Sequence, residues 1–135
     1  MTDSPLSGRR VLVVGASSGI GAALAKAVVS AGGDVAVSAR RSDRLDALVV
    51  EMGRGHAVPG DTTIPAEARR VADEAAAAMG GLDLMVYVAG YGVLQPLVDT
   101  DPVVWTDVFQ VNVVGANLAT AAALGHLDRT GLVAF

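Results

Sequence analysis

Three glycines near the start of the chain, Gly15, Gly19 and Gly21, have a G-x-x-x-G-x-G spacing that suits phosphate binding. They follow an apolar run at residues 11–14 and precede a helical pattern, which predicts a strand, a turn and a helix. A phosphate can approach a helix N-terminus closely only where no side chain blocks it, and the free N–H groups and the helix dipole attract its charge. We therefore expect a phosphate-bearing ligand here; the alternative is a tight turn between packed elements. The candidate binding residues are Gly15, Ser17, Ser18, Gly19, Ile20 and Gly21.

A second candidate for phosphate binding is the pair Arg40-Arg41, which follows a predicted strand at residues 35–39. A dinucleotide-binding domain that prefers NAD places Asp or Glu at this point, about 20 residues past the glycines, to hold the ribose 2′-hydroxyl. Here two arginines stand in that place, and guanidinium groups bind phosphate oxygens through paired hydrogen bonds. We therefore expect NADP(H) rather than NAD(H), with a solvated Arg-Arg turn as the alternative.

Apolar runs alternate with helical patterns along the whole chain. We expect strands over residues 11–14, 35–39, 56–59, 82–89 and 131–135, and helices over about 20–31, 43–52, 65–79 and 102–127. Strands that are apolar on both faces and separated by helices indicate a doubly wound parallel sheet. We predict an α/β fold in which residues 1–135 form a single dinucleotide-binding domain of Rossmann type.

Some details of these elements can also be predicted. Asp43 and Asp101 are expected to cap the helices that follow them, Asp101 because Pro102 comes next. The inner face of the first helix is expected to hold Ile20, Leu24, Ala27, Val28 and Ala31.

The composition excludes several classes of protein. With 135 residues, 52% of them hydrophobic, the chain is long and apolar enough for one folded core, which argues against disorder. The sequence has no cysteine, which excludes disulfides, thiolate metal sites and cysteine nucleophiles. We expect no metal site, and we expect the protein to reside in a reducing compartment. A net charge of −4 without a basic stripe disfavours nucleic acid as a partner.

Export and membrane insertion are also disfavoured. Arg9-Arg10 imitates a twin-arginine export signal, but the apolar run after it is broken by Gly15. No apolar run approaches the roughly 18–20 residues that a membrane span needs. We expect a cytoplasmic protein.

In its glycine motif, which ends Gly-Ile-Gly, the chain resembles the short-chain dehydrogenase/reductase family. Three further segments resemble that family's motifs in the same order: Gly60-Asp61-Thr62, Ala89-Gly90 and Val111-Asn112-Val113. The resemblance implies that Asp61, with Thr62, binds the adenine of the cofactor and that Ala89 and Gly90 belong to the cofactor site. From the residues alone, Asp61 could equally be a helix cap or a turn residue.

For Asn112 the resemblance implies a supporting role in proton transfer. From spacing alone, Asn112 falls on one helical face with Trp105, Val108 and Phe109, where a buried amide that packs or bends the helix is the alternative. Departures from the family motifs, such as Tyr87-Val88 in place of Asn-Asn, are expected to remove hydrogen bonds that tie the fourth strand to its neighbours.

The resembling family performs catalysis with a serine and a Tyr-x-x-x-Lys pair, and this chain has neither. Its single lysine is Lys26, its tyrosines are Tyr87 and Tyr91, and no serine follows Ser42. The family places these residues after the fifth strand, so we expect a cofactor-binding portion, truncated after that strand and inactive by itself. The complete form would interconvert a small alcohol and a carbonyl compound by hydride transfer.

Two alternatives remain open at this point: a non-catalytic NADP(H)-binding module, and a truncated, inactive fragment. The residues at 132–135 would form an apolar sheet edge, of the kind that natural proteins cover. Because some family members pair through the helix that contains Asn112, association into a homo-oligomer is a further expectation.

Overall fold

The computed structural model describes residues 4–135, so residues 1–3 of the expected domain lie outside the described part. Five parallel strands form one sheet in the order β3-β2-β1-β4-β5. The strands are β1 (Arg10–Val14), β2 (Asp34–Ser38), β3 (His56–Ala57), β4 (Leu84–Tyr87) and β5 (Leu132–Ala134). The helices are α1 (Gly19–Ser30), α2 (Ser42–Met52), α3 (Pro65–Met79), α4 (Pro102–Phe109) and α5 (Ala116–Leu124). The predicted α/β fold is confirmed.

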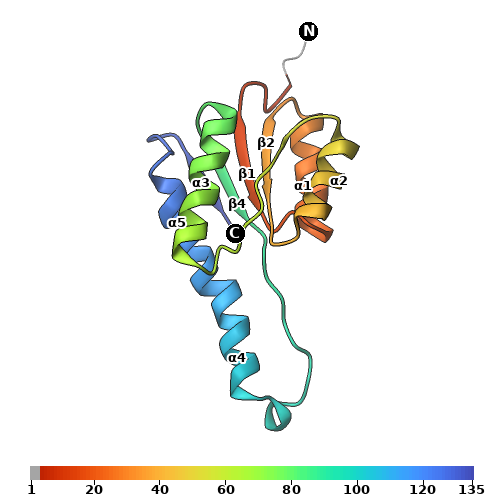
Figure 1. Ribbon diagram of the computed structural model, residues 1–135, viewed down its shortest axis with the longest axis vertical. Helices are drawn as coiled ribbons and strands as arrows, with labels where there is room; N and C mark the ends of the chain where they lie inside the picture. Colours follow the sequence, from red (N-terminus) through yellow and green to blue (C-terminus); the bar gives the residue numbers. More distant parts are fainter. Residues whose placement is uncertain (1–3) are drawn as a thin grey trace.

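Two helical layers cover the sheet, α1 and α2 on one face and α3 and α5 on the other (Figure 1). Each layer closes its own core, because alternate residues of a strand point to opposite faces. In β1, Val11 and Val13 pack on the side of α1 and α2, whereas Leu12 and Val14 pack on the side of α3 and α5. The sheet grows from β1 in both directions, so the strand order reverses between β1 and β4, where ligands bind in open α/β sheets.

The observed elements correct several predicted boundaries. Strand β3 has two residues and β4 has four, fewer than predicted. Single backbone hydrogen bonds to the neighbouring strands continue past both strands, from Val58 to Val37 and from Val88 to Val14. Asp43 lies in the first turn of α2 and does not cap it; Arg41 occupies the cap position. Asp101 does cap α4, because its side chain accepts a hydrogen bond of 2.8 Å from the N–H of Val103.

The buried face of α1 also differs from the predicted one. The helix buries Gly21, Ala25 and Val28, whereas the side chain of Ile20 is 78% exposed. The apolar pattern had assigned Ile20 to the core because its spacing from Leu24 fits a helical face. In the structure Ile20 lies instead at the mouth of the cavity described below.

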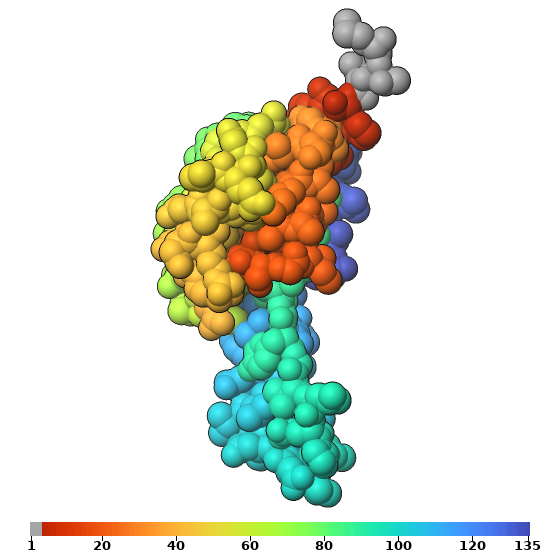
Figure 2. Space-filling model, turned by 90° about the vertical axis from the view of Figure 1, so that its right-hand side faces the viewer, coloured from red at the N-terminus to blue at the C-terminus, as the bar shows by residue number. Residues whose placement is uncertain are grey.

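The long helical stretch predicted to follow Asp101 consists of three parts. Between α4 and α5 lies a π-helical segment, Gln110–Gly115, in which the hydrogen bonds of the α-helix are locally rearranged. The loop after β4 and helix α4, residues 91–109, project away from the sheet as an arm (Figures 1 and 2). Exposed apolar side chains gather on this arm: Tyr91, Val93, Leu94, Leu97, Val98, Val103, Trp105 and Phe109. In the described part of the chain, no helix has both the length and the apolar character needed to span a bilayer.

An ion pair holds the opposite end of the sheet, where β1 and β4 begin. The Asp83 carboxylate accepts hydrogen bonds from the Arg10 backbone N–H and Nε at 2.8 and 2.9 Å, and from Nη2 at 2.9 Å. These bonds from Arg10, opposed by partial burial, lower the pKa of Asp83 to about 2. Arg10 also donates to the carbonyl of Gly80 at 2.6 Å, so it joins both strands to the end of α3.

We predict that Asp83→Asn lowers the free energy of unfolding by about 1–2 kcal/mol near neutral pH. Because the pKa is depressed in the folded state, the stabilisation is fully present above the ordinary pKa of an aspartate and is lost as the pH falls through about 2. Urea unfolding from about pH 7 down to about pH 2 measures it, and the two proteins should converge at the acid end. Asp46→Asn, on the exposed side of α2, is the matched control and should change stability by less than about 0.5 kcal/mol. A constant difference at every pH would contradict the prediction.

Candidate cofactor site

A cavity of about 810 Å³ opens at the carboxyl ends of β1, β2 and β4. It lies at the switch point of the sheet, where the ends of β1 and β4 diverge. All the predicted cofactor-binding residues line it: Gly15, Ser17, Ser18, Gly19, Ile20, Gly21, Arg40, Arg41, Asp61, Thr62, Ala89 and Gly90. Asn112 is not among the lining residues. The tertiary structure therefore unites segments from four separate places in the sequence.

The glycine-rich turn is fixed by backbone contacts to both neighbouring strands. The N–H groups of Gly15 and Ala16 donate to the carbonyl of Ser38, at the end of β2, at 2.8 and 3.1 Å. Gly15 has φ +95°, and a Cβ at this position would overlap the backbone of Ala89. A Cβ at Gly21 would overlap the carbonyl of Gly15. The two glycines are thus required by close packing of backbone on backbone.

The N-terminus of α1 opens onto this cavity. Its cap residue, Ser18, is extended and its side chain makes no capping hydrogen bond, and the first turn contains no acidic residue. The first N–H groups of a helix have no partner within the helix, and the helix dipole adds partial positive charge there. This terminus therefore fits the negative charge of a phosphate group.

Two arginines border the cavity beside the turn. Arg40 and Arg41 are exposed, and Arg41 Nη2 donates to Ser17 Oγ at 3.2 Å. Within residues 4–135, neither guanidinium forms an ion pair with a carboxylate. Their charge therefore remains available to a ligand, and a second phosphate near the glycine-rich turn would suit them.

Asp61 forms a turn and also lines the cavity. Its Oδ1 accepts hydrogen bonds from the N–H of Thr63 at 3.0 Å and from Thr63 Oγ1 at 2.6 Å. Among the described residues, Oδ2 has no hydrogen-bond partner. Asp61 is thus a turn residue, as its residue type alone suggested. The turn leaves Oδ2 able to accept a hydrogen bond from a ligand.

Asn112 has a different role from the one that its spacing suggested. The side chain is exposed, so the expected buried, packing amide is wrong. Its Oδ1 accepts from the N–H of Tyr91 at 3.0 Å and its Nδ2 donates to the carbonyl of Tyr91 at 2.9 Å. Asn112 therefore holds the loop after β4 to the π-helical segment. Trp105 and Phe109 on the helix are exposed, because the arm projects away from the core.

Tyr87 is a lining residue that the sequence did not identify. Its hydroxyl donates to the carbonyl of Val111 in the π-helical segment at 2.6 Å, and burial raises the pKa of the phenol. This bond ties β4 to the helical segment that follows it, a contact that the sequence did not predict. The sequence did contain a signal for this bond: Tyr87 lies at the end of a predicted buried strand, and a buried tyrosine hydroxyl usually has a hydrogen-bond partner.

Comparisons with known proteins agree with this architecture. A family model described as short chain dehydrogenase matches residues 9–134. The chain is similar to a short chain dehydrogenase of Pseudocercospora fijiensis, 42% identical over 125 residues, with 88% of this chain and 40% of that protein covered. It is also similar to the glucose 1-dehydrogenase of Gluconobacter oxydans, 37% identical over 131 residues, with 93% of this chain and 49% of that protein covered. The chain spans about half the length of the curated relatives it matches.

Solved structures give the same result. A short chain dehydrogenase from Burkholderia cenocepacia, solved in complex with NADP, matches with a TM-score of 0.88 and 36% identity over 95% of this chain and 54% of that one. A blue fluorescent protein from a metagenomic library, solved in complex with NADPH, matches with a TM-score of 0.85 and 27% identity over 94% of this chain and 54% of that one.

Proposed function

The chain belongs to the short-chain dehydrogenase family, and from this premise we propose that it is the NADP(H)-binding portion of an oxidoreductase that interconverts a small alcohol and a carbonyl compound. The observation that carries the proposal is the pair Arg40-Arg41, bordering the cavity with no carboxylate partner in the described chain. The relatives solved with NADP and NADPH support the same choice of cofactor.

The residues around the cavity suit the separate parts of a phosphorylated dinucleotide. The turn from Gly15 to Gly21 and the N-terminus of α1 would hold the pyrophosphate, because the space beside Gly19, where a side chain would lie, is open. Arg40 and Arg41 would bind the 2′-phosphate, and Asp61 Oδ2 would accept a hydrogen bond from the adenine amino group. A bound nicotinamide supplies or accepts hydride, and the protein provides position and proton transfer.

The chain itself offers no complete set of residues for proton transfer. Lys26 is bonded to Glu51 on the outer side of α1, at 2.6 Å, and does not line the cavity. The Tyr87 hydroxyl is bonded to a backbone carbonyl, and both polar groups of the Asn112 side chain are bonded to Tyr91. A non-catalytic module that binds NADP(H) is the second candidate function, and these engaged side chains favour it.

We predict that Arg40→Ala weakens NADPH binding by about tenfold or more and changes NADH binding much less. The reason is the loss of charge-assisted hydrogen bonds to the 2′-phosphate, each worth roughly 1.5–3 kcal/mol. Fluorescence titration with each reduced cofactor measures both affinities. Arg44→Ala removes the same charge from α2 outside the cavity and serves as the matched control. Equal NADPH affinities for Arg40→Ala and the unmodified chain would refute the assignment of Arg40.

A second prediction concerns turnover. The 135-residue chain should bind NADPH but not oxidise it in the presence of a panel of aldehydes and ketones, because it lacks the serine and the Tyr-x-x-x-Lys pair of the family. Absorbance of the reduced nicotinamide follows the reaction directly. Substrate-dependent oxidation above that of a denatured sample would show that other residues transfer the proton.

We also propose that copies of the chain associate through the arm. Leu94 is fully exposed and Val98 is 92% exposed, and both lie in the group of exposed apolar side chains on the arm. Exposed groups of apolar side chains mark surfaces that associate with a partner. Leu94→Glu should shift sedimentation toward the monomer, because association would bury the new charge. Val50→Glu is the control, since Val50 is 81% exposed on α2, away from the arm. A monomeric unmodified chain at high concentration would count against association.

A further inference from the structure

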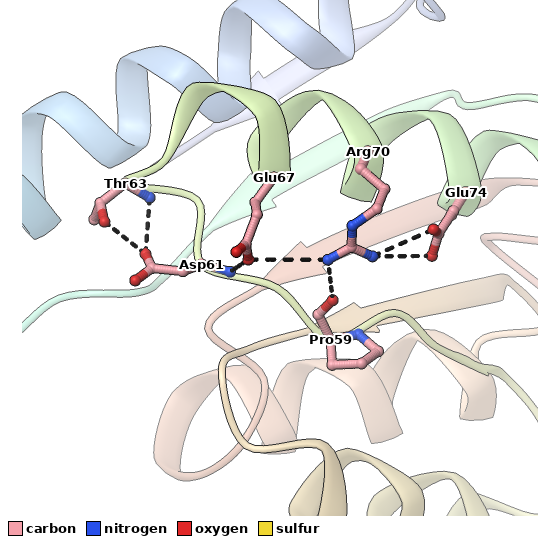
Figure 3. Close-up of polar contacts among 6 residues, drawn as sticks. All are labelled: Pro59, Asp61, Thr63, Glu67, Arg70 and Glu74. Atoms are coloured by element: carbon pink, nitrogen blue, oxygen red, sulfur yellow. Dashed lines mark hydrogen bonds and ion pairs between the residues drawn. The ribbon is translucent and has the colours of Figure 1, made fainter.

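Polar side chains at the start of α3 reach back to the segment that precedes the helix (Figure 3). Glu67 Oε2 accepts a hydrogen bond of 2.6 Å from the backbone N–H of Asp61. One turn further on, Arg70 Nη2 donates to the carbonyl of Pro59 at 2.9 Å. Arg70 also pairs with Glu67 at 3.9 Å and with Glu74 at 3.2 Å. The two bonds to the backbone lie on either side of Gly60.

Gly60 is held between the sheet and the helix. Its N–H donates to the carbonyl of Ala39 at 3.0 Å, on the side of β2. On the other side, a Cβ at Gly60 would lie 2.6 Å from Val71 Cγ2 of α3. The backbone from Pro59 to Asp61 is therefore packed directly against α3, and Glu67 and Arg70 provide its polar attachment there.

Glu67 does not act as an ordinary helix cap. The cap residue of α3 is Ile64, which has no polar side chain, and Glu67 stands three residues later, where a carboxylate commonly bonds to the N–H of the cap residue. Here it bonds instead to Asp61, three residues before the cap. Its shortest contact thus holds the segment that lines the cavity.

The charge of Glu67 needs compensation because it lies near the cofactor site. Glu67 does not line the large cavity, but it borders an adjoining hollow of about 440 Å³ together with Arg40, Asp61 and Arg70. An uncompensated carboxylate there would oppose the binding of a phosphate at Arg40. The N–H of Asp61 and the guanidinium of Arg70 provide that compensation.

We propose that Glu67 is a positioning residue for base recognition and acts through Asp61. Its bond fixes the backbone of Asp61, and the bonds from Thr63 fix Oδ1, so Oδ2 remains as an acceptor held in one place at the cavity. An acceptor in this position selects a base that carries an amino group over a base that carries a carbonyl oxygen. The inference rests on the proposed function, since it assigns a residue that orients the adenine-binding group of the same site.

The test compares NADPH with its deamino analogue, in which hypoxanthine replaces adenine and the 6-amino group becomes a carbonyl. Binding of both is measured by fluorescence titration for the unmodified chain, Glu67→Ala, Glu67→Asp, Glu67→Gln and Glu74→Ala, with thermal melts to confirm folding. In Glu67→Ala, and in Glu67→Asp with its shorter reach, the preference for NADPH over the analogue should fall about fivefold. Glu67→Gln keeps an acceptor oxygen and should retain the preference. Glu74→Ala, which removes a partner of Arg70 but no contact to the segment, should retain it as well.

The ratio of the two affinities distinguishes a positioning role from a general structural role, because a loosened fold would lower the affinity for both ligands by the same factor. An unchanged ratio in both Glu67→Ala and Glu67→Asp would overturn the inference, as would an equal loss in Glu67→Gln or Glu74→Ala. These results would leave NADPH binding by the unmodified chain intact and the proposed function standing. Failure of the unmodified chain to bind NADPH would overturn the proposed function, and this inference with it.

Discussion

At Gly15 the backbone of one residue touches the ends of two other strands. Its N–H donates to Ser38 at the end of β2, and its Cα lies so close to Ala89 after β4 that no side chain would fit. The strand order reverses next to this point, so the contact holds together the two halves of the sheet where they diverge. The glycine-rich turn, the end of β2 that precedes the arginines and the loop after β4 meet at this contact. A larger residue at 15 would therefore disturb the whole rim of the cavity.

The same type of side chain serves structure in one place and the site in another, and its partners decide which. Arg10 and Arg70 are hydrogen-bonded to carboxylates and to backbone carbonyls, so their charge is neutralised within the fold. Arg40 and Arg41 have no carboxylate partner in the described chain and border the cavity. In a chain with a net charge of −4, this arrangement leaves positive charge at the cavity, where an anionic ligand needs it.

The loop after β4 depends on the π-helical segment at its far end. This segment provides the Val111 carbonyl that Tyr87 binds and carries Asn112, which binds the backbone of Tyr91. Both bonds hold the start of the arm against the body of the protein. The arm that carries the exposed apolar residues is thus attached to the rest of the protein by hydrogen bonds where it begins.

The sequence by itself determined the alternation of strands and helices, the parallel doubly wound sheet and the segments that line the cavity. These follow from apolar periodicity and from glycine spacing, which are local properties of the chain. It assigned Ile20 both to the glycine-rich site and to the buried face of α1, because periodicity cannot distinguish an apolar residue in the core from one beside a ligand site, and only the structure decided for the cavity. The sequence did not reveal the partners of Asn112, Tyr87 or Glu67 either, and it placed Asn112 in an apolar environment that the projecting arm does not provide. Polar groups find their partners across long stretches of sequence, such as Arg10 with Asp83, and only the packing of the elements brings such pairs within hydrogen-bonding distance.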